Sequence, residues 1–133
     1  MEKKISAQVV IINKDGNILC VSRKYDHTKM GMPGGKMEEY DLEEPRLTAV
    51  RETFEETGIM INASDLELVF ATHKGGRLSY TFLASKYTGE INFNEPHAVE
   101  WIGFKSLIDG PFGEYNKQVH DSLLDMRVKF NYR

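Results

Sequence analysis

The most informative run of this sequence is Arg51-Glu52-Thr53-Phe54-Glu55-Glu56-Thr57-Gly58-Ile59. On an α-helix, where each residue turns the chain by about 100°, its carboxylates gather on one face. These carboxylates belong to Glu52, Glu55 and Glu56. The residues expected on the opposite, buried face are Leu47, Val50, Phe54 and Thr57. Pro45 near the start and Gly58 just past the end predict a helix over 44–57.

An acidic helix face is most often a solvated surface, but two features favour a metal site here. Glu52 and Glu56 are like charges four positions apart, which costs an isolated helix about 0.2–0.5 kcal/mol. They also lie in the last turns, where the helix dipole disfavours negative charge. A bound divalent cation removes both costs, and converging carboxylates suit Mg²⁺ or Mn²⁺. Arg51 is placed to pair with Glu55 one turn further on.

Outward from this helix, the remaining segments predict an α/β domain. The expected strands cover 3–13, 18–23, 66–73, 78–87 and 99–104, with tight turns at Asp15-Gly16 and Gly75-Gly76. A last helix starts near Glu114, and its core stripe is Val119, Leu123, Met126 and Phe130. The segment 25–33 is expected to be irregular. Together these elements predict an α/β/α sandwich with a mixed β-sheet and two main helices.

Composition excludes several classes of protein. The 133 residues fit one domain over 1–133. The net charge of −3 argues against a broad basic face, so no stable nucleic-acid partner is expected. No apolar run approaches the roughly 20 residues of a membrane span, and no secretory signal is expected. Cys20 stands alone, which is consistent with a cytoplasmic location.

Residues 35–59 together resemble the Nudix box. Arg51, Glu52, Glu55, Glu56, Gly58 and Ile59 match the family pattern at its spacing, and the preceding Pro33-Gly34-Gly35 resembles its usual approach. Glu43 matches the isolated Glu of the pattern. Two features depart from it. Seven residues separate Gly35 from Glu43 where the pattern has five, so Asp41 stands at the strict spacing, and Thr53 occupies an aliphatic position.

The resemblance implies a Nudix-like fold and Mg²⁺-dependent hydrolysis of a nucleoside diphosphate linked to another group, with Mn²⁺ as a substitute. It assigns metal binding to Glu52, Glu55, Glu56 and the Gly34 carbonyl. Glu52 and Arg51 would act in catalysis, Arg51 by orienting a metal-binding carboxylate. Glu43 would anchor the junction between loop and helix, with Asp41 as the weaker alternative for that role. Glu100 is the candidate further base, with Glu95 and His97 as alternatives and an ordinary strand-end carboxylate as the plain interpretation.

Substrate choice in this family lies outside the box. The short chain and the pair Glu100-Trp101 resemble the MutT-type members, which act on nucleoside triphosphates, oxidised ones among them. Asn116 would read a purine edge, because an amide both donates and accepts, unless it is only an N-cap or first-turn residue of the last helix. Arg23 would contact phosphate, unless it is a solvated cation. ADP-ribose, dinucleoside polyphosphates and capped RNA ends stay open as substrates, as does a binding module without turnover.

Overall fold

The computed structural model describes residues 4–92 and 98–133. Its strands are β1 (Lys4–Ile11), β2 (Ile18–Arg23), β3 (Asp26–Gly31), β4 (Gly34–Lys36), β5 (Leu66–Lys74), β6 (Arg77–Ala84) and β7 (Val99–Ile102). Its helices are α1 (Pro45–Thr57), α2 (Phe104–Ile108) and α3 (Gly113–Asp125), with short 3₁₀ turns at Glu39–Asp41 and Ala63–Asp65. The α/β class and the two long helices are therefore confirmed.

The strands form two sheets. The larger has the order β4-β1-β6-β5, and it is mixed because β1 runs parallel to β6 while the other pairs are antiparallel. The smaller, β3-β2-β7, is antiparallel. β1 and β2 are joined by a turn at Gly16, whose φ of +81° favours glycine, and they share only the Ile12–Ile18 bridge. The hairpin predicted there thus opens at once, and each strand enters a different sheet.

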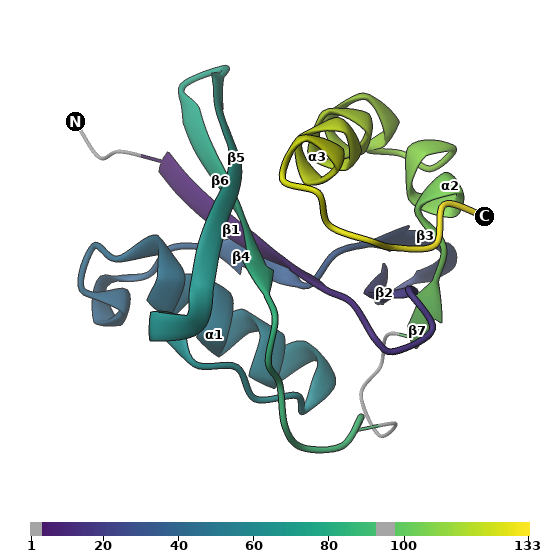
Figure 1. Cartoon of the computed structure of the whole chain (residues 1–133). Coiled ribbons are helices and arrows are strands. Elements are labelled where there is room, and N and C mark those ends of the chain that lie inside the picture. Colours follow the sequence, from purple (N-terminus) through teal and green to yellow (C-terminus); the bar gives the residue numbers. More distant parts are fainter. Residues whose placement is uncertain (1–3, 93–97) are drawn as a thin grey trace.

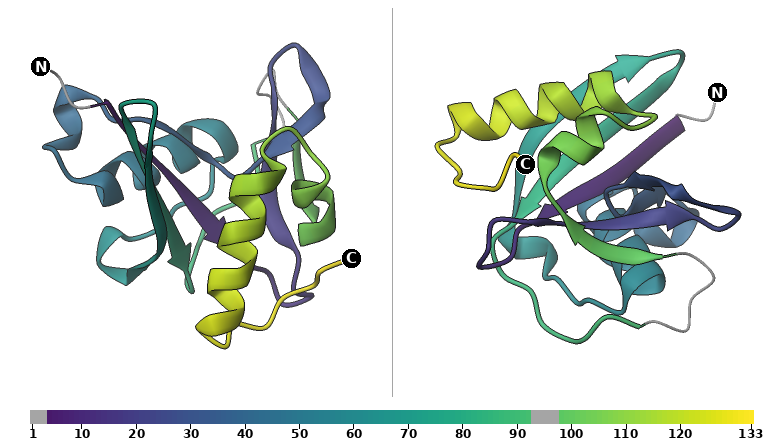
Figure 2. Two further views of the ribbon diagram at one scale, coloured as in Figure 1. Left: turned by 90° about the horizontal axis from the view of Figure 1, so that it is seen from above. Right: turned by 90° about the vertical axis from the view of Figure 1, so that its right-hand side faces the viewer.

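Side chains of β1 alternate between two hydrophobic layers. Ala7, Val9 and Ile11 belong to the layer that includes Ala49 of α1. Val10 belongs to the layer formed with α2 and α3. Figures 1 and 2 show α1 on one side of the strands and α3 on the other. The sandwich is thus set by the two-residue period of a buried strand.

Several local predictions are corrected. The second, antiparallel sheet and α2 were not expected, and 25–33 contains β3, whose side chains are mostly too exposed to leave a hydrophobic pattern. Phe54, expected in the core, is 54% exposed. Phe130 lies beyond α3, because the chain turns after Asp125, with a left-handed Arg127. Across the described residues, no helix is long and apolar enough to cross a membrane.

The buried face of α1 is lined by small polar residues. Thr53 is fully buried, and among the described residues its hydroxyl is the buried side-chain group with no hydrogen-bond partner. Burying such a group costs about 1–3 kcal/mol. Thr53→Val should therefore raise the free energy of unfolding by about 1 kcal/mol, measured as a higher urea midpoint.

Thr57→Val is the matched control for this substitution. The Thr57 hydroxyl donates to the Thr53 carbonyl at 2.7 Å and accepts from the Ile59 amide at 3.0 Å. Its removal should lower the urea midpoint. A Thr53→Val protein less stable than the parent would contradict this account of the helix face.

Candidate functional site

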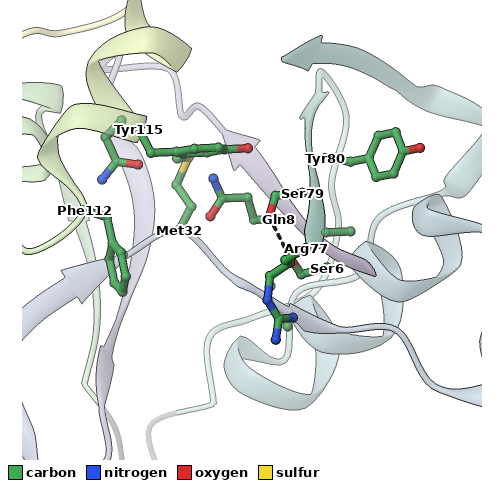
Figure 3. Close-up of a pocket in the computed structure, with 13 residues that line it drawn as sticks. Ser6, Gln8, Met32, Arg77, Ser79, Tyr80, Phe112 and Tyr115 are labelled. Atoms are coloured by element: carbon green, nitrogen blue, oxygen red, sulfur yellow. Dashed lines mark hydrogen bonds between the residues drawn. The ribbon is translucent and has the colours of Figure 1, made fainter. Parts of the chain in front are cut away.

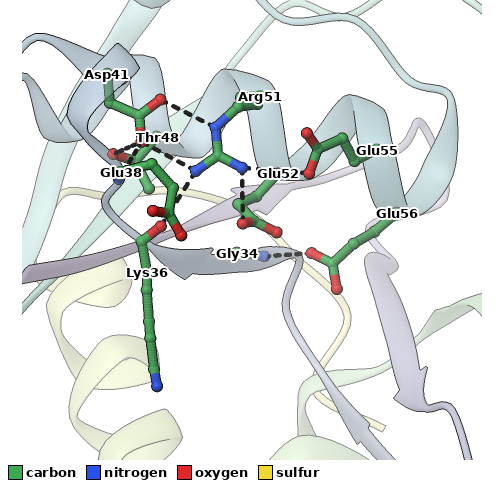
Figure 4. A network of polar contacts seen from close by, with 9 residues as sticks. All are labelled: Gly34, Lys36, Glu38, Asp41, Thr48, Arg51, Glu52, Glu55 and Glu56. Atoms are coloured by element: carbon green, nitrogen blue, oxygen red, sulfur yellow. Dashed lines mark hydrogen bonds and ion pairs between the residues drawn. The ribbon is translucent and has the colours of Figure 1, made fainter.

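Arg51 of α1 is the centre of a network of charged side chains (Figure 4). Its guanidinium makes a bidentate contact with Asp41, Nε to Oδ1 at 3.0 Å and Nη2 to Oδ2 at 2.9 Å. The same group donates to Glu52 at 2.9 Å, to Glu55 at 3.2 Å and to the Lys36 carbonyl at 3.1 Å. Arg51 thus ties the loop before α1 to two of the three carboxylates on its face.

Asp41, and not Glu43, anchors the junction between loop and helix. The Asp41 side chain is buried and also accepts from the Thr48 hydroxyl and the Glu38 amide, each at 2.9 Å. Hydrogen bonds from Arg51 lower the pKa of Asp41 against its burial. Glu43 is exposed, with a left-handed φ of +58°, next to Leu42 at +56°. The two extra residues therefore lie after Asp41. The assignment of the anchor to Glu43 is wrong, and Asp41, the weaker alternative at the strict spacing, takes that place.

Glu52 lies against the backbone of β4. A Cβ added to Gly35 would lie 2.5 Å from Glu52 Cδ, so only glycine leaves room for this carboxylate. Burial raises the pKa of Glu52, and its hydrogen bond with Arg51 opposes that rise. Glu55 lies further out, with its side chain 54% exposed. The close approach expected of the glycine pair is thus an approach to a carboxylate.

Glu56 is held by the other glycine. Its Oε1 accepts from the Gly34 amide at 2.9 Å. Burial, together with the charges of Glu52 and Glu55, raises the pKa of Glu56 to about 7, although the Gly34 hydrogen bond lowers it. Glu56 is therefore a carboxylate largely removed from water, close to two others.

The register of β4 shows where the Gly34 carbonyl points. The Val9 amide donates to the Pro33 carbonyl, and the Met37 amide donates to the Ile5 carbonyl. Gly34 lies between these pairs, opposite Gln8. Because pairs alternate in an antiparallel ladder, Gly34 is at a non-hydrogen-bonded position, and its backbone groups face away from β1. Its carbonyl thus points to the same side as the amide that contacts Glu56.

Gly35→Ala should displace the Glu52 carboxylate with little effect on stability, because the end of a flexible side chain can move aside. We expect Mn²⁺ affinity, measured by titration calorimetry, to fall by about tenfold or more. Gly110→Ala is the control for an added methyl group outside both cavities. Its Cβ would lie 3.3 Å from the Ser106 carbonyl oxygen, so some stability should be lost while Mn²⁺ affinity stays unchanged. Unchanged Mn²⁺ affinity in Gly35→Ala would exclude Glu52 from the metal site.

The three carboxylates line a cavity of about 680 Å³ together with cationic side chains. Arg23, Lys24 and Lys29 contribute the positive charge, and Arg23 also lies over the Phe112 ring, 5.6 Å from its centroid. Arg23 is thus brought to the carboxylates although it comes from the other sheet. A cavity with both signs of charge suits a metal-bound phosphate ligand.

A second cavity, of about 410 Å³, adjoins the first and shares Gly31, Met32 and Phe112 with it (Figure 3). Asn116 lines it, and the Asn116 amide donates to the Leu107 carbonyl at 3.2 Å. Phe112 is the N-cap of α3, so Asn116 does not cap the helix, but it is buried in the first turn as the plain interpretation allowed. The Tyr80 ring points away from the cavity and stacks on Phe82 in the core.

Glu100 is not brought into either cavity. It lies in β7 opposite Cys20, and its side chain is exposed. The alternatives Glu95 and His97 lie outside the described residues. Residues that sequence reasoning missed are Lys29, Gln8 and Tyr115, all of which line a cavity. Their place in the cavities follows from the strand register and the packing of α3, and no local sequence motif marks these residues.

An α/β/α domain with an acidic, cation-lined cavity suits a phosphate-bearing ligand. A family model described as NUDIX domain matches residues 2–123, and the chain belongs to this family. It is 31% identical over 100 residues to a MutT-like protein of Streptomyces ambofaciens, covering 74% of this chain. The chain spans 62% of the length of that relative.

Solved structures share the fold. A MutT NUDIX hydrolase from Burkholderia pseudomallei is 25% identical, with a TM-score of 0.71 and coverage of 92% of this chain and 99% of the other. An ADP-ribose pyrophosphatase from Streptococcus suis is 18% identical, with a TM-score of 0.70 and coverage of 96% and 95%. The second likeness supports the fold alone.

Oxygen donors on α1 and β4 fit the divalent cation that this family requires. The described acidic, histidine and cysteine side chains do not gather into a ready-made metal cluster. Burial first, and then the charges of Glu52 and Glu55, disfavour the ionised form of Glu56, and a dication would favour it. Gly35 leaves the Glu52 carboxylate the space it needs.

Proposed function

We propose that this chain hydrolyses the pyrophosphate bond of nucleoside diphosphate-linked compounds. Nucleoside triphosphates, oxidised ones among them, are the first substrates proposed, giving a nucleoside monophosphate and pyrophosphate. The observation that carries the proposal is the junction of the two cavities at Gly31, Met32 and Phe112. One cavity holds carboxylates and cations, and the other offers amides and aromatic rings. A nucleotide has the same division into a polyanionic end and a planar, hydrogen-bonding end.

Mg²⁺ is the proposed metal, held by Glu52, Glu55, Glu56 and the Gly34 carbonyl. When bound, it neutralises phosphate oxygens and lowers the pKa of a coordinated water. Arg51 positions Glu52 and Glu55 through its hydrogen bonds. Arg23 binds phosphate at the mouth of the site, and Asn116 contacts the base.

Two carboxylates are candidates for the general base. Glu52 lies in the acidic cavity, and burial raises its pKa, which makes it a stronger base. Glu100 reaches the site only if the chain around β7 moves. Glu100→Gln is therefore expected to lower the turnover number far less than Glu52→Gln, measured under saturating Mg²⁺. Equal losses in the two variants would return Glu100 to the role of base.

A product profile tests the proposed activity. Purified protein with Mg²⁺ or with EDTA would be offered ordinary and 8-oxo nucleoside triphosphates, ADP-ribose and diadenosine polyphosphates, and products would be separated by chromatography. We expect Mg²⁺-dependent release of a nucleoside monophosphate and pyrophosphate from a triphosphate. Turnover of ADP-ribose or a dinucleotide alone would keep the chemistry and overturn the choice of substrate. No turnover across the panel would favour the binding module. The expected partner is a small nucleotide, met in the cytoplasm.

A further inference from the structure

The floor of the second cavity is polar where the rest of the sheet interior is hydrophobic. β1 and β6 run parallel, and Ser6 lies opposite Ser79 while Gln8 lies opposite Thr81. The two serine hydroxyls are 3.0 Å apart, and Gln8 Nε2 donates to Thr81 Oγ1 at 2.9 Å. Figure 3 shows the Gln8 side chain extending from β1 toward Met32, within the cavity.

The NH₂ group of Gln8 meets two linked hydroxyl groups. Thr81 is fully buried, and its Oγ1 lies 2.6 Å from the Tyr115 hydroxyl. Tyr115 comes from α3, so the relay joins the sheet to the helix that closes the cavity. Burial raises the pKa of Tyr115, while hydrogen bonds with Thr81 and Gln8 oppose this, so the phenol stays protonated at neutral pH.

With its NH₂ group directed at Thr81, Gln8 offers its carbonyl oxygen to a ligand. The side-chain amide carries an NH₂ donor on one side and a carbonyl acceptor on the other. When the NH₂ group contacts the protein, the carbonyl oxygen is left for a ligand. Asn116 follows the same rule, because its NH₂ group donates to the Leu107 carbonyl. Both amides that line the cavity therefore present acceptors.

We propose that Gln8 determines base specificity, its carbonyl oxygen accepting an N–H from an amino group on the nucleobase. Thr81 and Tyr115 are positioning residues that keep the amide in this orientation. The inference rests on the proposed function, since it takes the second cavity to hold a nucleoside.

This arrangement discriminates amino-bearing bases from their oxo counterparts. A carbonyl acceptor pairs with an amino group but repels a carbonyl oxygen, and an unpaired polar group in a half-buried site lowers affinity. The loss of one such hydrogen bond corresponds to about a tenfold change in affinity. The informative ligand pairs are CMP and UMP, AMP and IMP, and GMP and XMP, in each of which an oxo group replaces an amino group.

Titration calorimetry with these monophosphates tests the proposal without turnover. In the parent protein, at least one amino-bearing member should bind about tenfold more tightly than its partner. Gln8→Met keeps the length of the side chain. It should lower the affinity for the amino-bearing ligand until the two members of the pair bind about equally. Tyr115→Phe should reduce the preference in another way. The Gln8 amide would be free to rotate and donate its NH₂ group to an oxo group, so the affinity for the oxo ligand should rise. A purely structural role of Tyr115 would weaken both ligands alike. Gln118→Met, at an exposed position of α3, is the control and should change nothing.

An equal affinity within all three pairs, or a preference that survives Gln8→Met, would overturn the proposal. Either result is separable from failure of the proposed function. Triphosphate turnover without base preference would leave the hydrolase intact and remove Gln8 from specificity. A preference lost in Gln8→Met, in a protein that turns over none of the substrates, would keep the specificity residue and remove the hydrolase.

Discussion

Glu56→Gln is expected to lower Mg²⁺-dependent turnover by at least about a hundredfold while leaving the fold intact. Glutamine keeps an oxygen for the Gly34 amide, so the contact between α1 and β4 can persist. It removes one of the negative charges that attract the cation. Kinetics with the best substrate of the product profile, at several Mg²⁺ concentrations, would measure both the turnover number and the metal dependence.

The same substitution should stabilise the metal-free protein above neutral pH. The pKa of Glu56 is raised from 4.5 to about 7, so the folded state binds a proton more tightly than the unfolded state does. The free energy of unfolding therefore falls as the pH rises from about 4.5 to about 7. Glutamine removes this penalty, which is worth about 3 kcal/mol at pH 8. Thermal melts at pH 5 and pH 8 in EDTA would show a gain confined to pH 8.

Glu67→Gln is the matched control, because Glu67 is exposed on β5 and lines neither cavity. It should alter neither turnover nor the pH dependence of melting. Retained turnover in Glu56→Gln would remove Glu56 from the metal site. A gain in stability equal at both pH values would show that charge is not its cause.

Arg51→Ala is expected to destabilise the protein by about 3 kcal/mol, because it strands a buried carboxylate. Asp41 retains only the Thr48 hydroxyl and the Glu38 amide as partners. In the parent, Asp41 has a lowered pKa, so its contribution to stability is present above its unfolded pKa and is lost as the pH falls further. The stability lost in Arg51→Ala should therefore be largest at neutral pH and shrink in acid.

A double-mutant cycle with Asp41→Asn would measure the coupling in urea. The sum of the stability losses in the two single variants should exceed the loss in the double variant, since removing both charges leaves neither unpaired. Lys117→Ala, at an exposed site of α3, controls for the loss of a cation and should shift the midpoint little. Additive losses, or a loss below about 1 kcal/mol in Arg51→Ala, would show that the pair behaves as an exposed surface salt bridge.

Helix α1 was predictable because its signals are local. Pro45, Gly58 and the spacing of the glutamates act within one helix, where residues three and four apart share a face. Its buried side was harder: Thr53 and Phe54 lie about 100° apart on the helix, and hydrophobicity favours burial of Phe54, whereas the tertiary contacts bury Thr53. The exposed strand β3 left no pattern at all, because few of its side chains enter the core.

The sequence alone determined the acidic face, the glycine pair and the family to which they belong, because a fixed local geometry ties those residues together. Tertiary structure decided which groups they meet. The turn after Asp41 made that residue the partner of Arg51, and the register of β1 and β6 placed Gln8 beside Thr81. The packing of α3 placed Tyr115 and Asn116 in the wall of the same cavity as Gln8. These contacts join segments far apart in the chain, where packing of the whole core sets the distance between side chains.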